Sequence, residues 1–359
     1  MSECRLRDRS SLTVYPGNAG AVTINVGSGV RSLLFLQDGR HLLSGSDDCR
    51  IRQWRINDGV EVGEAMNTTG GHITGMALSP DGNWIVCSGK RVASVWNMRT
   101  RQRTLTISEH SNWVNPVDVS PDSSRFVTGS DDSTAVIWDI ATGTRLVGPL
   151  QHNSAVLGVK FSPSGDRIAT GDQETLRIYH AVSGELLRTF QVSITSFPST
   201  PIWWSSTQSI FAISSNTLFH LDENTGRTFY SWTIPGVVPV NNCRSISLAS
   251  NNRFIGAYVG NSISLWDPST SAQICSVITN SSDVWSFAIS SDSKYLISSV
   301  KEVITIRNLD SIIPAYYLAG EQPLGGEADL QLQFQALRDE FHALQSRFGM
   351  FLGKQLAFD

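Results

Sequence analysis

The chain contains little cysteine, and its cysteines are not arranged in pairs. Among 359 residues there are five of them. A disulfide framework needs an even, regularly spaced set, and a structural zinc site needs closely spaced pairs such as C-x-x-C. We therefore expect free thiols, a reducing compartment and no metal. The scattered positions are Cys4, Cys49, Cys87, Cys243 and Cys275.

Long apolar runs are also absent. No uncharged stretch of about 18 apolar residues occurs, so we expect no membrane-spanning helix. The first nine residues, MSECRLRDR, carry charges where a signal peptide has its apolar centre. We therefore expect an intracellular protein, cytoplasmic or nuclear. The formal net charge of −4 provides no overall attraction to nucleic acid, and no nucleic-acid partner is predicted.

Sequence motifs for catalysis are missing as well. The chain has no G-x-S-x-G elbow and no H-E-x-x-H pair. Gly27-Ser28-Gly29 lacks the lysine and the following helix of a phosphate-binding loop. We therefore predict a non-enzymatic protein without a cofactor. An enzyme with its active site at the mouth of a central channel is the alternative.

What the sequence does contain is a repeat. Short apolar strands end at matching positions separated by 42, 42, 41, 42, 45 and 41 residues. Turn sequences such as Ser120-Pro121-Asp122 precede these strands at a regular distance. A period of 40–45 residues that carries four strands is typical of one propeller blade, so seven periods predict seven blades. The matching positions are Trp54, Trp96, Trp138, Tyr179, Leu221, Trp266 and Arg307.

The third repeat carries the most informative residues. It contains a histidine before its first strand, a threonine on its second, an aspartate in the next turn and a tryptophan on its third. On this pattern the chain resembles a WD-repeat β-propeller over about residues 20–310. The resemblance implies an all-β, seven-bladed propeller, with a structural tetrad that satisfies a buried Trp N–H. The tetrad residues are His110, Thr128, Asp132 and Trp138.

The other repeats depart from this pattern. Repeat one has Ser44, Asp48 and Trp54 but no histidine, and repeat two has His72, Ser88 and Trp96 with Lys90 in place of the acid. Repeat four keeps His152 and Thr170 but ends in Tyr179. Repeats five to seven lack the histidine, so we expect packing and strand pairing alone to hold them. We interpret all three histidines, and the acid pairs 47–48 and 131–132, as structural.

The chain divides into four segments. Residues 1–19 form an N-terminal arm, residues 20–310 the propeller, residues 311–326 a linker and residues 327–353 a helix. The stretch 21–26 alternates like a strand, and we expect it to complete the last blade and close the ring. Blade five is expected to be irregular, because Pro198 and Pro201 stand where its inner strand begins.

The predicted C-terminal helix is amphipathic. Its apolar residues are spaced alternately by four and three positions, which is a heptad pattern. The helix could pack on the propeller, form a coiled coil with itself or with a partner, or lie on a membrane surface. The seam consists of Leu330, Phe334, Leu337, Phe341, Leu344, Phe348 and Phe351.

A propeller without an active site offers its loop-rimmed face to other proteins or peptides. We predict that residues beside the start of each inner strand form a binding rim, because Trp and Arg dominate binding hot spots. Alternatively, the two tryptophans plug the channel. The predicted rim residues are Arg31, Thr74, Trp113, Asn115, Leu157, Arg244, Asp283 and Trp285.

These features favour a protein-interaction scaffold or recognition module of an intracellular complex, with possible self-association through the C-terminal helix. One alternative rests on the segment 95–99, Val-Trp-Asn-Met-Arg. It is similar to the box of WD-repeat substrate receptors of cullin-type ubiquitin ligases. The acidic residue expected upstream of that box is missing, because Lys90 occupies the turn.

Overall fold

The computed structural model describes residues 21–68, 71–194, 201–205, 209–214, 217–234, 244–248, 254–268 and 270–318, with the backbone alone for residues 244–248. The predicted N-terminal arm and the predicted helix 327–353, with its whole seam, lie outside these residues.

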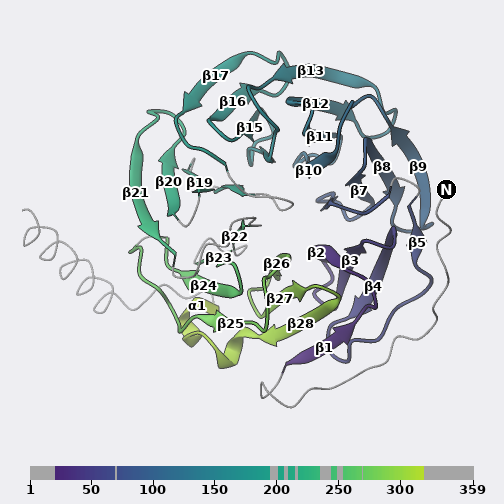
Figure 1. Ribbon diagram of the computed structural model, residues 1–359, viewed down its shortest axis with the longest axis vertical. Coiled ribbons are helices and arrows are strands. Elements are labelled where there is room, and N and C mark those ends of the chain that lie inside the picture. Colours follow the sequence, from purple (N-terminus) through teal and green to yellow (C-terminus); the bar gives the residue numbers. More distant parts are fainter. Residues whose placement is uncertain are drawn as a thin grey trace, which may run out of the picture.

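Seven four-stranded antiparallel sheets make up the described part of the chain, arranged around one axis like blades (Figure 1). In each blade the strands run from the axis outward in chain order, except in the last. Blade one comprises β2 (Val30–Phe35), β3 (His41–Ser46), β4 (Arg50–Arg55) and β5 (Met66–Asn67). Blade two comprises β6 (Gly75–Leu78), β7 (Trp84–Gly89), β8 (Val92–Asn97) and β9 (Gln102–Ile107).

The three middle blades follow the same order of strands. Blade three comprises β10 (Val114–Val119), β11 (Arg125–Ser130), β12 (Thr134–Asp139) and β13 (Arg145–Gln151). Blade four comprises β14 (Gly158–Phe161), β15 (Arg167–Gly171), β16 (Leu176–His180) and β17 (Leu186–Phe190). Blade five comprises β18 (Ile202–Trp204), β19 (Ser209–Ser214), β20 (Thr217–Asp222) and β21 (Thr228–Thr233).

The last two blades complete the ring. Blade six comprises β22 (Arg244–Leu248), β23 (Ile255–Val259), β24 (Ser262–Trp266) and β25 (Ile278–Thr279). Blade seven takes its inner three strands from the end of the propeller and its outer strand from the start of the chain. These are β26 (Ser286–Ile289), β27 (Tyr295–Val300), β28 (Val303–Asn308) and β1 (Val22–Asn25).

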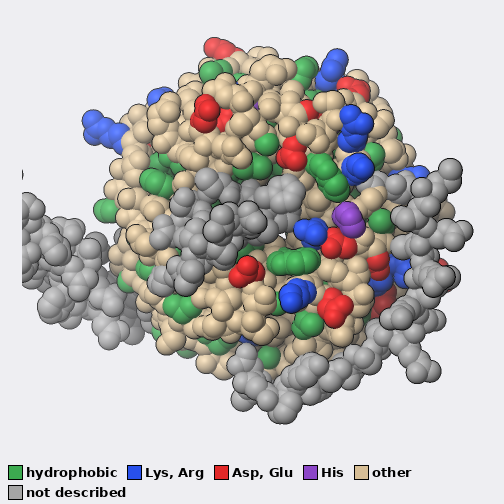
Figure 2. All heavy atoms as spheres, in the orientation of Figure 1, with side chains coloured by type: hydrophobic (Ala, Val, Ile, Leu, Met, Phe, Trp, Pro, Cys, Tyr) green, Lys and Arg blue, Asp and Glu red, His purple; other side chains and the backbone are tan. Residues whose placement is uncertain are grey.

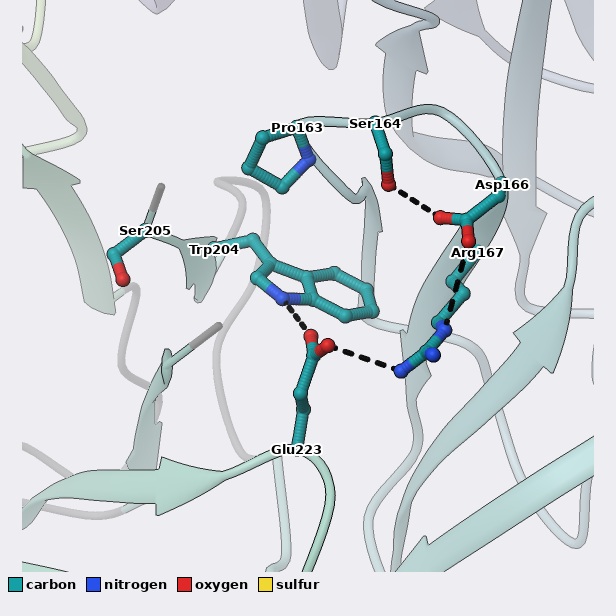
Figure 3. Close-up of a pocket in the computed structure, with 7 residues that line it drawn as sticks. All are labelled: Pro163, Ser164, Asp166, Arg167, Trp204, Ser205 and Glu223. Atoms are coloured by element: carbon teal, nitrogen blue, oxygen red, sulfur yellow. Dashed lines mark hydrogen bonds and ion pairs between the residues drawn. The ribbon is translucent and has the colours of Figure 1, made fainter. Parts of the chain in front are cut away.

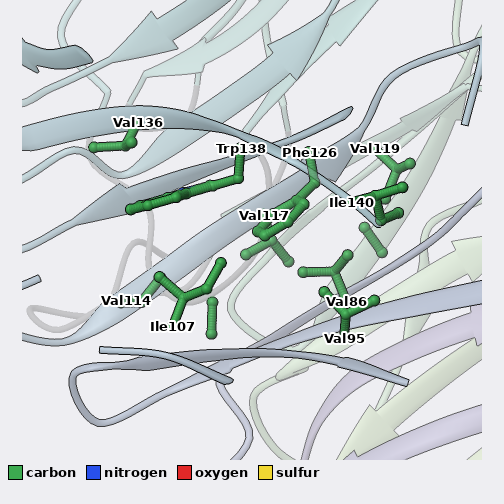
Figure 4. Close-up of a cluster of buried hydrophobic side chains, with 12 residues drawn as sticks. Val86, Val95, Ile107, Val114, Val117, Val119, Phe126, Val136, Trp138 and Ile140 are labelled. Atoms are coloured by element: carbon green, nitrogen blue, oxygen red, sulfur yellow. The ribbon is translucent and has the colours of Figure 1, made fainter. Parts of the chain in front are cut away.

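The core lies between neighbouring blades. Figure 4 shows such a layer, in which Phe126 and Trp138 of blade three face Val86 and Val95 of blade two. Phe126 pairs directly with Trp138 across β11 and β12, and both side chains are fully buried. Each blade is covered by a neighbouring blade on both faces, and the inner strand β10 is accordingly buried along its whole length, Asn115 and Asp118 included.

The ring is closed by pairing between the two ends of the propeller. Strand β1 runs antiparallel to β28, with Thr23 opposite Thr305 and Ile24 opposite Ile304. Ile24 is buried among residues of blades one and seven. Without β1, the edge of β28 would present unpaired backbone groups.

The chain does not leave the propeller at the end of β28. The 3₁₀ turn η1 (Leu309–Ser311) and the short helix α1 (Ala315–Leu318) follow directly. Ile313 and Tyr317 are buried against blades six and seven, and the Tyr317 hydroxyl donates to Asp267 Oδ2 at 2.9 Å. The first residues of the segment that we expected to be a linker, 311–326, are therefore part of the packed structure.

Candidate functional site

The tetrad of blade three forms one continuous hydrogen-bonded chain. The Trp138 indole N–H donates to Thr128 Oγ1 at 2.9 Å, and Thr128 Oγ1 lies 2.8 Å from His110 Nε2. His110 Nδ1 lies 2.9 Å from Asp132 Oδ2. Partial burial alone would raise the pKa of Asp132, but hydrogen bonds from Thr134 and His110 outweigh it and hold the pKa below its usual value. Every buried polar group here is satisfied, so the tetrad stabilises the blade.

Blade four contains the same chain, although its third strand ends in tyrosine. His152 Nε2 lies 2.9 Å from Thr170 Oγ1, and His152 Nδ1 lies 2.9 Å from Asp172 Oδ2. Sequence reasoning did not identify Asp172, because it stands two residues after Thr170, whereas Asp132 stands four residues after Thr128. Burial lowers the pKa of His152, and the neighbouring Asp172 opposes this effect only in part.

Blades one and two satisfy their tryptophans differently. Trp54 donates to Ser44 at 2.8 Å, and Asp48 pairs with Arg52 instead of a histidine. Trp96 donates to Ser94 on its own strand at 3.0 Å, and not to the expected Ser88 hydroxyl on the neighbouring strand β7.

Blade two therefore corrects the prediction that His72 and Ser88 hold tetrad positions beside Trp96. Ser88 donates instead to the Asn115 carbonyl at 2.7 Å, in the next blade. The imidazole of His72 is 55% exposed, so this histidine does not belong to a buried tetrad.

Blade seven corrects a second prediction, that packing and strand pairing alone hold the last blades. Arg307 stands where other repeats have tryptophan. Its guanidinium donates to Ser298 Oγ at 2.8 Å and to Asn280 Oδ1 at 2.9 Å. In blade five, the Trp204 indole donates to the carboxylate of Glu223. Polar networks therefore persist in both blades with different residue types.

A row of interacting side chains lies near the channel mouth. Asp47 is at its centre, because Arg31 Nε lies 2.5 Å from Asp47 Oδ1 and His72 Nδ1 lies 2.8 Å from the Asp47 carbonyl oxygen. The Arg31 guanidinium lies over the Trp285 ring, 4.8 Å from its centroid. On the other side, the His72 ring stacks on Trp113 with 6.3 Å between centroids. These five residues are called the rim row below.

The rim row joins four blades. Arg31 and Asp47 belong to blade one and His72 precedes blade two, whereas Trp113 leads into β10 of blade three and Trp285 into β26 of blade seven. Figure 2 shows the same combination of basic, acidic, histidine and hydrophobic side chains gathered near the centre of one face. A Cβ at Gly29 would lie only 2.7 Å from the Trp285 ring and 2.6 Å from Asp47 Oδ2. Glycine at this position therefore allows the indole and the carboxylate to approach each other.

Four of the predicted rim residues have side chains that are at least partly exposed. Arg31, Trp113 and Trp285 are half-buried, and Asp283 is exposed. The side chain of Arg244, the first residue of β22, lies outside the described residues.

Three other predicted rim residues are buried in the structure. Thr74 is 3% exposed and donates to the Val114 carbonyl, and Asn115 is 1% exposed and donates to Asp131. Leu157 belongs to the core between blades four and five. These residues therefore do not contribute to the rim surface. Sequence reasoning included them because it could not distinguish side chains that face the mouth from those that face the next blade.

A pocket of about 280 Å³ lies between blades four and five (Figure 3). Arg167 Nη1 lies 2.9 Å from Glu223 Oε1, and the other Glu223 oxygen accepts the Trp204 indole N–H. Burial raises the pKa of Glu223, which the Trp204 hydrogen bond and Arg167 only partly offset. The charges are paired with one another, so this arrangement joins two blades and leaves no group waiting for a ligand.

The described ranges contain no candidate metal site and no candidate membrane span. No group of three or more His, Cys, Asp or Glu side chains gathers there at metal-binding distance. Among the same residues, no helix has the length and apolar character needed to cross a membrane.

The repeated four-stranded sheets, closed by a strand from the start of the chain, define a seven-bladed β-propeller. The model of the WD domain, G-beta repeat, matches residues 13–55, 63–97, 101–139 and 145–180. Together with the tetrads of blades three and four, this match shows that the chain is a WD-repeat β-propeller.

Several curated proteins are similar to parts of the chain. Apoptotic protease-activating factor 1 of Rattus norvegicus is 31% identical over 107 residues, which is 28% of this chain and 8% of that protein. Nuclear distribution protein PAC1 of Komagataella phaffii is 32% identical over 96 residues, covering 25% and 19%. Protein groucho of Drosophila melanogaster is 27% identical over 126 residues, covering 33% and 17%. The chain thus spans less than a fifth of the length of these relatives.

Proposed function

We propose that this propeller is a non-enzymatic recognition module that holds another protein or a peptide against the rim row, within an assembly in the cytoplasm or nucleus. The observation that carries the proposal is the partly exposed Trp285–Arg31–Asp47–His72–Trp113 row. Trp, Tyr and Arg are the residue types enriched in binding hot spots, where they fill well-packed, desolvated pockets. The similarity of this chain to parts of a nuclear distribution protein and of an apoptotic protease-activating factor supports a role in complexes.

The rim row is also prepared for binding. Arg31 is already held by Asp47 and Trp285, so a partner does not have to pay for ordering a long side chain. Trp113 and Trp285 are only half-buried, and a partner that covers them gains apolar contact. If the two indoles instead only closed the channel, replacing them would affect stability before binding.

The test compares Trp285→Ala with Phe229→Ala in the full chain. Phe229 is 49% exposed on β21, at the circumference of the ring and away from the rim row. Proteins that co-purify with the tagged chain from its own cells would be quantified by mass spectrometry, and the melting temperature of each variant measured. We expect the recovery of specific partners to fall at least tenfold with Trp285→Ala and to stay unchanged with Phe229→Ala. Equal recovery with both variants at equal melting temperatures would contradict the proposal.

The cullin-receptor alternative has a specific basis in the second blade. Arg99, the last residue of the 95–99 segment, is exposed in the turn after β8, where the Asn97 side chain caps the backbone. Charge reversal, Arg99→Glu, would abolish co-purification of a cullin-ligase adaptor if this role were correct. The same variant would leave binding at the rim row unchanged.

A further inference from the structure

A second hollow lies at the circumference of the ring, where blades six and seven meet. It encloses about 570 Å³, within the range of small-molecule sites. Strands β25 and β28 and helix α1 lie together in this part of the molecule (Figure 1). The hollow is called the blade 6–7 pocket, and its walls include Ser276, Thr279, Arg307, Asn308, Ser311 and Ile312.

The pocket results from an interruption in the outer strand of blade six. Only Ile278–Thr279 form β25, and an isolated bridge joins Trp266 to Gln273 before it. Blade one has the same interruption with the same spacing, because β5 is Met66–Asn67 and a bridge joins Trp54 to Glu61.

In blade one the interruption is filled by an arginine from the next blade. Arg101 donates to the carbonyl oxygens of Glu64 at 2.7 Å and Val62 at 3.0 Å, and to Gln53 Oε1 at 2.7 Å. Arg101 follows the third-strand Trp96 by five residues. The residue five positions after Arg307 is Ile312, which is too short and apolar to fill the gap in blade six in this way. The space therefore stays open.

Arg307 gives this open space an unusual charge. Only 6% of the residue is exposed, and its two hydrogen bonds go to the neutral side chains of Ser298 and Asn280. Its Nε–H is buried without an acceptor, and no carboxylate of the described residues lies within ion-pair distance. Burial lowers the pKa of Arg307, in keeping with a cation that has lost hydration without gaining an anion.

A buried cation is normally paired, because the cost of removing it from water is large. A guanidinium has five N–H donors in a planar fork that matches a carboxylate, and only two of those of Arg307 are used. The other walls combine hydroxyls of Ser276, Thr279 and Ser311 with the aliphatic Val277, Ile278 and Ile312. The lining therefore suits one negative group attached to an aliphatic body better than a multiply charged phosphate.

We propose that the blade 6–7 pocket binds a carboxylate carried on a short aliphatic group, with Arg307 as its cationic partner and the side chains of Val277, Ile278 and Ile312 against its body. The site is separate from the rim row and does not depend on the function proposed for it.

The first test uses two matched probes on the full chain, 4-methylpentanoate and 4-methylpentanamide. They share the aliphatic body and differ in charge. Isothermal titration calorimetry should show one binding site for the carboxylate and at least tenfold weaker binding of the amide. Equal affinities, or no binding of either probe, would overturn the proposal.

Two variants locate the binding. Arg307→Gln should weaken binding of 4-methylpentanoate at least tenfold. Because this residue is buried and its replacement could unfold blade seven, an exposed position provides a second variant: Ser276→Glu places a competing carboxylate at the mouth, and Ser276→Gln is its neutral control. Binding should be lost in Ser276→Glu and kept in Ser276→Gln. If both Ser276 variants bind like the parent chain, the carboxylate does not bind here.

A third comparison distinguishes the source of the carboxylate. The peptide acetyl-Leu-Glu-Ile-amide presents a side-chain carboxylate between aliphatic residues, and acetyl-Leu-Gln-Ile-amide is its neutral counterpart. Binding of the glutamate peptide at least tenfold tighter than 4-methylpentanoate would support an acidic segment of a protein as the natural ligand. Binding of the free acid alone would support a small organic acid. Failure of the rim-row variants would leave either result unaffected.

Discussion

A single hydroxyl connects the buried polar chain of blade three. Thr128 Oγ1 accepts from the Trp138 indole and contacts His110, and all three residues are buried. Replacing Thr128 with the isosteric valine keeps the packing but leaves both partners unsatisfied. Each such loss costs about 1–3 kcal/mol, so we expect Thr128→Val to lower the free energy of unfolding by about 2–4 kcal/mol in urea titrations.

The control for this substitution is Thr189→Val. Thr189 is exposed on the outer strand of blade four, where valine suits a strand as well as threonine does. We expect its effect to stay within about 0.5 kcal/mol. If the two variants were equally stable, the tetrad would contribute no net stability.

His220 gives the propeller a sensitivity to mild acid. Its ring lies between Phe211 and Phe229, at 4.4 and 4.9 Å between centroids, and neither ring nitrogen has a hydrogen-bond partner. Burial lowers its pKa below the unfolded value of about 6.5. The unfolded chain therefore takes up the proton first, and stability is full above about pH 6.5 and falls as the pH drops below it.

We expect the melting temperature to fall between pH 7.5 and 5.5, and His220→Phe to remove part of that fall. His152, whose pKa is also lowered by burial, accounts for another part. The control is His180→Phe, because His180 contacts Ser183 at the surface. An unchanged pH profile in His220→Phe would show that His220 does not titrate in this range.

Single residues also show where prediction from the sequence succeeds and fails. The tetrad of blade three could be predicted because its four residue types stand at the family spacing. Asp172 was missed because it stands two residues after its threonine and not four. Arg307 looked like a missing tryptophan, although it donates to the equivalent hydroxyl of Ser298. A fixed motif describes residue types, whereas the fold requires only that a buried donor meets an acceptor.

At the scale of elements, the closing strand β1 is short but packs into the core between two blades. Ile24 is 3% exposed and packs between blades one and seven. Truncation of a buried isoleucine costs about 2–5 kcal/mol, so Ile24→Ala should lower the free energy of unfolding by that amount. Thr23→Ala, on the other face of the same strand, is the control and should cost less than about 1 kcal/mol. Equal effects would mean that β1 contributes by backbone pairing alone.

The order of strands could be predicted from the repeat, because each period contains the same turns and the same apolar alternation. The shortened inner strand of blade five, the three-residue β18, agrees with the prolines around it. The interrupted outer strands of blades one and six could not be predicted. The Arg101 side chain that fills the gap in blade one could not be predicted either, because it comes from the next blade.

For the whole molecule, the open question is the heptad seam of residues 330–351, which lies outside the described residues. We propose that it joins copies of the chain. Light scattering should then give a dimer or trimer for the full chain and a monomer for the double variant Leu337→Gln/Leu344→Gln. A monomer in both cases would exclude self-association. A truncation for the same purpose should end after Leu318, because Ile313 and Tyr317 belong to the propeller core.

Ring closure by β1 also determines when the fold can be completed during synthesis. Strand β1 leaves the ribosome first, but its partner begins only at Val303. At about 5–20 residues per second, β1 waits for about 15–60 seconds with its hydrogen-bonding edge unpaired. During that time the first blades can assemble in order, while the joint stays open to chaperones or to the β28 edge of another copy. The synthesis of β28 therefore determines when the ring can close, and a slow stretch of translation before Val303 would lengthen this exposure.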